Sequence, residues 1–243
     1  RATLQQILEL ESNLVQRADW TVAVTPQDLS QFQRWGIKRG ILAPNGTSPR
    51  KVDWGVLEET RRKLEGLKFL LFVGSNYPPN VRGFWKMVGN LSYLSPAEGI
   101  VAAGRIGEIL IESLPPELEL WKRYLEGRLI TPGFISEEEL TALYLLSNGV
   151  LIPILHGGGS NLKTAEALYF NRPIISTKFG LRGVSGEELA GIPVEVTETP
   201  EQFQWKIRQL LEAPPPVPTP GNLQFNPQFL WERTLQPLSQ ILK

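Results

Sequence analysis

The sequence predicts an α/β fold built on a doubly wound parallel sheet that helices cover on both faces. The first observation is a series of short, almost continuously apolar runs, at residues 69–73, 99–103, 129–131, 149–154, 173–177 and 193–197. The second is a series of helical stretches that alternate with these runs, near residues 57–66, 80–94, 136–147, 160–170 and 200–212. Strands buried on both faces are apolar throughout, and their alternation with helices is the pattern of a parallel sheet. The pattern leaves the order of the strands open.

Residues 1–47 precede this alternation and are expected to fold apart from it. Apolar residues at mostly helical spacing predict an amphipathic helix over residues 1–17. A short β-rich run follows at 20–24, and Thr25-Pro26 then begins a second helix that ends before Gly36. A further short run at 41–43 leads into the turn Pro44-Asn45-Gly46.

Residues 48–213 hold the regular alternation of strands and helices. Their clearest helix start is Ser136 with Glu139 three residues later, which together form a capping box. Residues 214–224 are rich in proline and predict a stiff, extended linker. In residues 225–243 apolar side chains from Phe229 to Leu242 recur at helical spacing. We therefore expect a terminal helix that docks away from the preceding element.

Composition narrows the classes of function. Lys and Arg total 25, as do Asp and Glu, so the chain lacks the net positive charge typical of a nucleic-acid-binding protein. It has no cysteine and a single histidine, His156, which argues against a thiolate or histidine-rich metal site. No apolar run reaches the roughly 20 residues of a transmembrane helix, and the start shows no signal peptide. We expect a cytoplasmic protein, free or peripheral to a membrane, whose start is compatible with a fragment.

The most informative segment is a run of three glycines, Gly157-Gly158-Gly159, between the apolar run at 149–154 and the next helix. Glycines allow a sharp turn and let a ligand reach the main-chain amides. The N-terminus of the following helix favours an anion, typically a phosphate. In an open α/β sheet such a crevice lies at the carboxyl edge of the strands, where ligands bind. Lys163 would add a positive charge there.

The pattern alone leaves two interpretations equally open, because short glycine motifs often occur by chance. Ser160 directly follows the glycines, so the segment is not a G-x-G-x-x-G fingerprint, and it lacks the Gly-Lys-Ser/Thr ending of a Walker loop. The plain alternative is a flexible turn between a strand and a helix. Lys163 would then be solvated, and Glu166 would be a surface residue of the helix.

Several motifs occur together and in a fixed order along the chain. The segment Gly157-Gly-Gly-Ser160-x-Leu-Lys163-x-x-Glu166-Ala-Leu is followed by Asn171-Arg-Pro173 and by Gly180-x-x-Gly183. Earlier stretches agree, namely Phe72-Val-Gly74-Ser75-Asn-Tyr-Pro-Pro-Asn80, Ile100–Gly104 and Gly133-Phe134-Ile135. In this order the motifs resemble those of the family 4-type retaining glycosyltransferases. The resemblance covers nearly the whole chain.

The resemblance implies a GT-B architecture, in which two Rossmann-like domains face a cleft. Residues 48–213 would be the nucleotide-sugar-binding domain with its Rossmann-like, doubly wound parallel sheet. Residues 1–47 would be a remnant of the N-terminal, acceptor-side domain, whose larger part would be missing or separate. Residues 214–224 would be the linker, and residues 225–243 a C-terminal helix that crosses back to the N-terminal domain.

The resemblance also assigns the residues around the three glycines. Glu166 matches the glutamate that accepts hydrogen bonds from the ribose hydroxyls. The loop whose amides meet the diphosphate or the donor sugar matches Gly157, Gly158, Gly159 and Ser160. Many relatives carry a second glutamate with seven residues between the two, at the position of Gly158. The triple-glycine branch of the family resembles this chain there, so the departure does not imply an inactive protein.

Two further loops are assigned in the same way. Phe134 and Ile135 lie where the nucleobase packs, and Gly74 and Ser75 where the first loop approaches the phosphates. Many relatives place an Arg and a Lys on the diphosphate after the first strand, whereas residues 75–78 contain no basic residue. Neutralisation of the diphosphate would then depend on helix ends and on Lys163.

The implied activity is transfer of a sugar from a nucleotide-diphosphate sugar to a hydroxyl group of a sugar or lipid-linked acceptor. It would proceed with retention at the anomeric carbon and without a metal ion or other cofactor, and no catalytic residue is assigned. Two alternatives stay open, because fold alone does not fix function. One is a non-catalytic nucleotide-sugar-binding module that needs a separate acceptor domain. The other is an epimerase- or phosphorylase-like relative with the same fold.

The remaining conspicuous side chains have plain interpretations beside the functional ones. His156 is expected in a loop at the mouth of the cleft. Arg105 and Arg182 would either pair with a phosphate or acceptor group or be solvated. Three tryptophans at helical core spacing are expected to be packing anchors, namely Trp85, Trp205 and Trp231.

Overall fold

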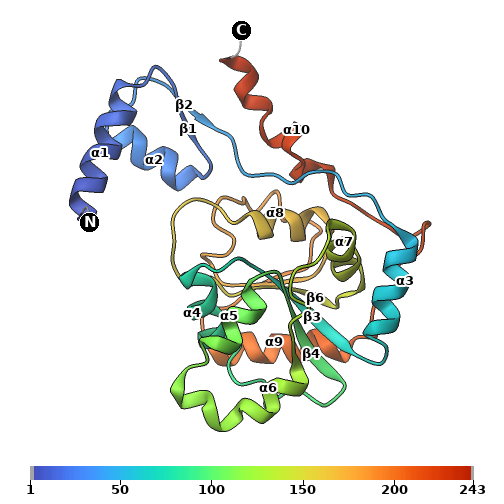
Figure 1. Ribbon diagram of the computed structural model, residues 1–243. Helices are drawn as coiled ribbons and strands as arrows, with labels where there is room; N and C mark the ends of the chain where they lie inside the picture. The colour runs from blue at the N-terminus through green and yellow to red at the C-terminus, as the bar shows by residue number, and fades with distance from the viewer. Residues whose placement is uncertain (1–2, 242–243) are drawn as a thin grey trace.

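The structure is a computed structural model that describes residues 3–241. Its main body is a six-stranded parallel sheet in the order β5-β4-β3-β6-β7-β8, with helices on both faces (Figure 1). The strands are β3 (Lys68–Val73), β4 (Glu98–Ala103), β5 (Leu129–Ile130), β6 (Gly149–Ile152), β7 (Ile174–Ser176) and β8 (Val194–Val196). All six strands lie within the apolar runs of the sequence or within one residue of them. The predicted doubly wound, Rossmann-like fold is confirmed.

The core consists of two layers because successive strand residues point to opposite faces of the sheet. Phe69 and Leu71 of β3 pack in one layer, and Leu70 and Phe72 pack in the other. The first layer is covered by α3 (Trp54–Lys63), α7 (Glu137–Leu146) and α8 (Leu162–Tyr169). The second is covered by α4 (Pro78–Met87), α5 (Ile106–Glu112), α6 (Lys122–Arg128) and α9 (Pro200–Glu212).

The strand order creates a crevice at the middle of the sheet. After β3, the chain adds β4 and β5 on one side, and then returns to place β6, β7 and β8 on the other. The strands β3 and β6 pair in parallel, with Leu70 opposite Gly149. Their carboxyl ends therefore flank the point where the winding direction reverses, which is where open α/β sheets bind ligands.

The structure contains helices that the sequence pattern did not predict. Residues 106–128 form α5, a 3-10 helix η1 (Pro116–Trp121) and α6 between β4 and β5. No residue of η1 is buried, and α6 buries only Leu125. An amphipathic period is therefore nearly absent from η1 and α6. Among the tryptophans, Trp85 is buried as expected, but Trp205 is 56% exposed and is not a packing anchor.

Residues 4–42 form a small N-terminal part outside the six-stranded sheet (Figure 1). It comprises α1 (Leu4–Arg17), β1 (Thr21–Ala23), α2 (Pro26–Arg34) and β2 (Gly40–Leu42), and β1 pairs with β2 in parallel. Thr25 caps α2 as predicted. The first two residues of the helix expected at 1–17 lie outside the described range. No residue of α1 is buried, and its apolar side chains are exposed by 43–73% at Leu4, Ile7, Leu8, Leu10 and Leu14.

The C-terminal segment returns toward the N-terminal part (Figure 1). Residues 214–224 form no helix or strand. The single helix expected over 225–243 is replaced by short turns, η2 (Pro227–Phe229), α10 (Trp231–Thr234) and η3 (Gln236–Gln240). Pro237 has no amide hydrogen to continue α10, and Leu242 lies outside the described range. The amide of Thr47 donates to the Phe229 carbonyl (2.8 Å), and the Trp231 amide donates to the Thr47 carbonyl (3.0 Å).

Candidate functional site

The three glycines lie in the loop from β6 to α8, at the reversal point of the sheet. Gly157 (φ +149°) and Gly159 (φ +68°) adopt conformations that L side chains rarely adopt. A Cβ on Gly158 would meet no atom within 4 Å. Gly157 and Gly158 are exposed and Gly159 is partly exposed. The loop therefore presents bare main chain at the ligand-binding edge of the sheet.

The N-terminus of α8 lacks the side-chain cap that several other helices have. Asn161 is the N-cap residue, but its Nδ2 donates to the carbonyls of Phe179 and Gly180 (both 3.3 Å) and its side chain caps no amide. In α7, by contrast, the Ser136 hydroxyl accepts from the Glu139 amide. An uncapped first turn keeps helix amides available to an anion. The hydroxyl of Ser160, just before the helix, is buried without a partner in the part of the chain that the structure describes.

Lys163 is partly buried and hydrogen-bonded, which contradicts the interpretation of a solvated surface lysine. Its Nζ donates to Asn80 Oδ1 (2.5 Å) and lies 5.4 Å from the centroid of the Phe72 ring. Asn80 Nδ2 in turn donates to the Ser75 carbonyl (3.1 Å), which belongs to the loop after β3. Burial lowers the pKa of Lys163 to about 8. Gly74 and the exposed Ser75 are thus connected to α8 through Asn80 and Lys163.

Glu166 is the fifth residue of α8, and two side chains fix its orientation. Its Oε1 accepts from Arg50 Nη2 (2.8 Å), and its Oε2 accepts from the Tyr144 hydroxyl (3.1 Å). Burial, with Glu166 adding to it, raises the pKa of Tyr144 well above its ordinary value, so this phenol stays a neutral donor. The Glu166 side chain is 18% exposed. A carboxylate offers about four acceptor positions. The hydrogen bonds from Arg50 and Tyr144 occupy two of them, so the others can accept from ligand hydroxyls.

The loop with Phe134 and Ile135 lies just before α7. The Phe134 side chain is 95% exposed, whereas Ile135 packs partly against the core. Arg50 also pairs with Glu137 at the start of α7 (3.0 Å). Arg50 therefore links Glu166 to the end of α7 that follows the Phe134 loop.

The small pocket beside the glycine loop collects only part of the predicted site. Its volume is about 40 Å³, and its lining includes Tyr77, Asn80, His156, Arg182 and the three glycines. His156 is exposed at this pocket, in a loop as expected. Phe134, Ile135 and Glu166 do not line it. Ligand pockets usually measure about 300–1,000 Å³, so this pocket alone is too small for an ordinary ligand.

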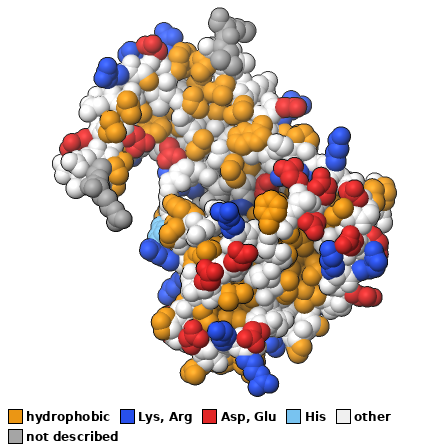
Figure 2. All heavy atoms as spheres, in the orientation of Figure 1, with side chains coloured by type: hydrophobic (Ala, Val, Ile, Leu, Met, Phe, Trp, Pro, Cys, Tyr) orange, Lys and Arg blue, Asp and Glu red, His pale blue; other side chains and the backbone are white. Residues whose placement is uncertain are grey.

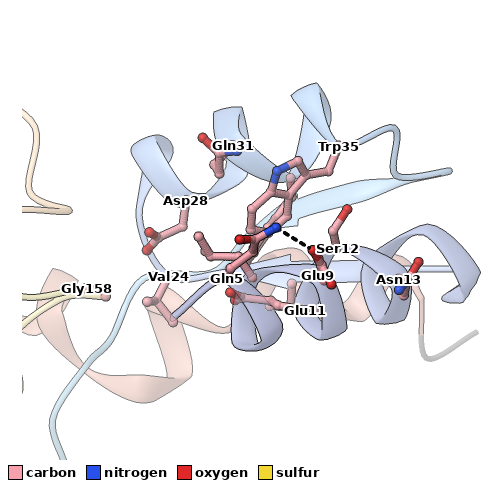
Figure 3. Close-up of a pocket in the computed structure, with 14 residues that line it drawn as sticks. Gln5, Glu9, Glu11, Ser12, Asn13, Val24, Asp28, Gln31, Trp35 and Gly158 are labelled. Carbon is pink, nitrogen blue, oxygen red and sulfur yellow. Dashed lines mark hydrogen bonds between the residues drawn. The ribbon is translucent and has the colours of Figure 1, made fainter. Parts of the chain in front are cut away.

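A larger open cavity of about 930 Å³ lies mostly within the N-terminal part, between α1 and α2, and reaches Gly158 and Gly159 of the glycine loop at one end. Figure 3 shows its residues, most of which come from α1, α2 and the strand region between them, with Gly158 at one end. The space-filling view in Figure 2 shows the molecule hollowed between the N-terminal part and the main body. The glycine loop thus faces both the small pocket and this cavity.

The sequence alone does not reveal several partners of the site residues. It did not predict Arg50 and Tyr144 as partners of Glu166, nor Asp28 as the partner of Arg182 (2.5 Å). Arg182 is therefore not a solvated arginine, whereas Arg105 is exposed.

Within residues 3–241, no helix is long and apolar enough to cross a membrane. In the same range no group of three or more His, Cys, Asp or Glu residues is placed to hold a metal ion.

Comparison with known families identifies this fold. The model of the family described as glycosyl transferases group 1 matches residues 68–213, which is more than half of the chain. The chain belongs to this family. The match covers the whole six-stranded sheet, the loops after β3 and β6, and α8. A search of the curated proteins finds no significant match.

Solved structures show the same GT-B fold. HepE from Anabaena, in complex with UDP and glucose, matches with a TM-score of 0.64 and 20% identity, over 86% of this chain and 58% of HepE. WaaG, a glycosyltransferase of lipopolysaccharide biosynthesis, gives 0.63 and 16%, over 86% of this chain and 58% of WaaG. Sucrose-phosphate synthase from Thermosynechococcus elongatus gives 0.63 and 18%, over 98% of this chain and 61% of that enzyme. The chain thus spans about three fifths of the length of these structures.

Proposed function

We propose that this chain is the nucleotide-sugar-binding half of a glycosyltransferase that transfers a sugar from a nucleotide-diphosphate sugar to a hydroxyl acceptor. The triglycine loop is the observation on which the proposal depends. It exposes bare main chain between β6 and the uncapped N-terminus of α8, at the reversal point of a group 1 glycosyltransferase fold. Main-chain amides and a helix N-terminus are suited to a diphosphate.

The diphosphate would be held by the loop of Gly157, Gly158, Gly159 and Ser160, by the first turn of α8 and by Lys163. Gly74 and Ser75 would approach it from the loop after β3. A hydrogen bond from Lys163 to Asn80, which itself donates to the Ser75 carbonyl, supports this role. When the sugar–phosphate bond breaks, negative charge develops on the departing diphosphate. Preorganised amides and a partly desolvated ammonium would stabilise that charge.

The nucleoside would lie toward the start of α7. Glu166 would accept hydrogen bonds from the ribose hydroxyls with its remaining acceptor positions, while Arg50 and Tyr144 hold its orientation. The nucleobase would pack against Phe134 and Ile135, and the Phe134 ring is free to contact it because it is 95% exposed. Binding would therefore bury an aromatic side chain that now lies in solvent, which favours association.

Residues 1–47 would belong to the acceptor-side domain, with the C-terminal segment crossing back to them. Two parallel strands with an uncovered apolar helix are a fragment of an α/β layer, since parallel sheets are normally covered on both faces. The rest of that domain would come from the same or another chain. Retention at the anomeric carbon, independence of metal ions, and a cytoplasmic or membrane-peripheral location stay predictions from the family resemblance.

The proposal is tested by titrating the complete protein with UDP, GDP and ADP sugars in a thermal-shift assay. HepE has been crystallised with UDP-glucose, which makes that donor the first to try. Binding to the native state raises the unfolding temperature in proportion to the logarithm of ligand concentration. We expect one nucleotide class to do so. If none does at millimolar concentration, the donor site is wrong, and if donor binds but no acceptor panel releases UDP, the protein is a binding module.

A further inference from the structure

Arg182 connects the glycine loop to the N-terminal part of the molecule. It lies in the turn after β7, and its Nη1 donates to the Gly157 carbonyl (2.9 Å). Its Nη2 donates to Oδ1 of Asp28 in α2 (2.5 Å). The two side chains are 21% and 22% exposed, so solvent screens this ion pair less than an ordinary surface pair. One guanidinium thus bridges two segments that are far apart in sequence.

Asp28 is held in place by Thr25 as well as by Arg182. Its amide donates to the Thr25 hydroxyl (3.0 Å), and that hydroxyl donates to Asp28 Oδ2 (2.7 Å). Thr25 is fully buried at the start of α2. Asp28 Oδ1 therefore has a fixed position relative to α2, near the end of the large cavity that Gly158 closes (Figure 3).

The two parts also approach closely beside this bridge. Gly183 adopts φ +90°, and a Cβ there would lie 3.0 Å from both Thr25 Cγ2 and Ser160 Cβ. Asn45 Nδ2 donates to the Ser160 carbonyl (3.5 Å). The contact leaves no room for a larger residue, so movement of α2 changes the space available to the loop.

We propose that Arg182 is a positioning residue of the donor site: through Asp28 and Gly157 it makes the arrangement of the triglycine loop depend on the placement of residues 1–47. The consequence for donor binding rests on the proposed function. The planar guanidinium suits this role because its fork donates to two acceptors in fixed directions, which a lysine ammonium does not reproduce. Closure of the N-terminal part onto the main body would then also set the arrangement of the triglycine loop.

The first test measures the distance between the two parts without any ligand. The 243 residues contain no cysteine, so spin labels can be attached at Ser30→Cys on α2 and Glu138→Cys on α7, both exposed. We expect Asp28→Asn and Arg182→Gln to broaden or lengthen the distance distribution. Lys38→Gln, which removes an exposed ion pair with Asp19 in the same N-terminal part, is the matched control. Distributions identical to that of the unsubstituted protein would overturn the proposal.

The second test is calorimetric titration with UDP. We expect Asp28→Asn and Arg182→Gln each to weaken binding about fivefold or more, and the double variant to be no weaker than the worse single variant, because one bridge is lost in all three. Arg182→Lys should recover less than half of the UDP affinity that Arg182→Gln loses. If the distances change but the variants bind UDP normally, Arg182 does not position the loop. If the unsubstituted protein binds no UDP while the distances change, the proposed function fails and the bridge stands.

Discussion

Glu166 of α8 and Arg50 of the segment before α3 form an ion pair with an Nη2–Oε1 distance of 2.8 Å, although 116 positions separate them in sequence. The Arg50 side chain is 11% exposed and also reaches Glu137 of α7. The carboxylate that we propose for the ribose is therefore oriented before any ligand arrives. A ligand hydroxyl would add to an existing arrangement rather than having to order a mobile side chain, which lowers the entropic cost of binding.

Replacing Glu166 by alanine should weaken donor binding by about 1–3 kcal/mol, the usual cost of losing hydrogen bonds to a charged group. Glu166→Gln keeps one acceptor oxygen and should lose less. Calorimetric titration with UDP and GDP sugars measures both effects. Glu137→Ala is the control, because it removes the other partner of Arg50 and is 82% exposed. Equal affinity of Glu166→Ala and unsubstituted protein would remove this residue from the site.

Gly158→Val should block the donor while leaving the fold intact. Gly158 has no neighbour within 4 Å of a Cβ and does not adopt a left-handed conformation, unlike Gly157 and Gly159, so a side chain there projects into open space above the loop. Gly186, which is also unobstructed, provides the matched control Gly186→Val. Circular dichroism verifies folding, and titration with UDP measures binding. A folded Gly158→Val protein with normal affinity would mean that the phosphates lie elsewhere.

Donor affinity should fall as pH rises through about 8, where Lys163 of the free protein loses its proton. Below this pH the ammonium is charged and attracts the diphosphate. Above it, binding must take up a proton, which costs up to tenfold in affinity per pH unit. Titrations between pH 7 and 9 with the intact UDP-sugar measure the slope. Lys163→Met should bind more weakly at pH 7 and show a flatter profile, and equal slopes in the two proteins would contradict a phosphate role for Lys163.

Gly83→Ala tests how closely α4 must approach the start of the glycine loop. A Cβ on Gly83 would overlap the Pro153 carbonyl oxygen, so the helix or the loop must shift. Overpacking of this kind destabilises proteins by about 1–3 kcal/mol. The contrasting variant is Gly127→Ala in α6, where a Cβ meets no atom within 4 Å, and it should stabilise by about 0.4–1 kcal/mol. Urea denaturation of both variants measures the difference, and equal midpoints would show that α4 yields without cost.

The sequence predicts those parts of the fold in which buried positions recur regularly and are filled by apolar residues. The runs of β3 and β6 are apolar because both faces of each strand are covered, and Ser136 with Glu139 forms the predicted capping box. Residues 116–128 escaped prediction because η1 buries no residue and α6 buries only Leu125, so the stretch carries little apolar period. Strand order depends on contacts between distant segments, which a single sequence does not reveal.

The same division holds for the site. Local chemistry marked the glycines and Glu166, since a strand, a tight turn and a helix follow one another in the chain. The ion pairs of Arg50 with Glu166 and of Arg182 with Asp28 join residues 116 and 154 positions apart. From the sequence alone, Arg50 and Arg182 could each be solvated surface residues. Burial of Lys163 was missed for a related reason, because Phe72 and Asn80 come from other elements.

The turn at residues 44–47 contacts the returning C-terminal segment, and this contact has a mechanical consequence. At Gly46 a Cβ would come within 2.8 Å of the Trp231 nitrogen and 2.7 Å of Thr234 Oγ1, and Thr47 is hydrogen-bonded on both sides to the returning segment. The two halves are therefore joined by a pair of chain segments clamped at one spot. Because both segments are held at this contact, we expect the N-terminal part to rotate about it rather than to slide or twist relative to the main body. We therefore expect any opening between the N-terminal part and the main body to pivot at this glycine.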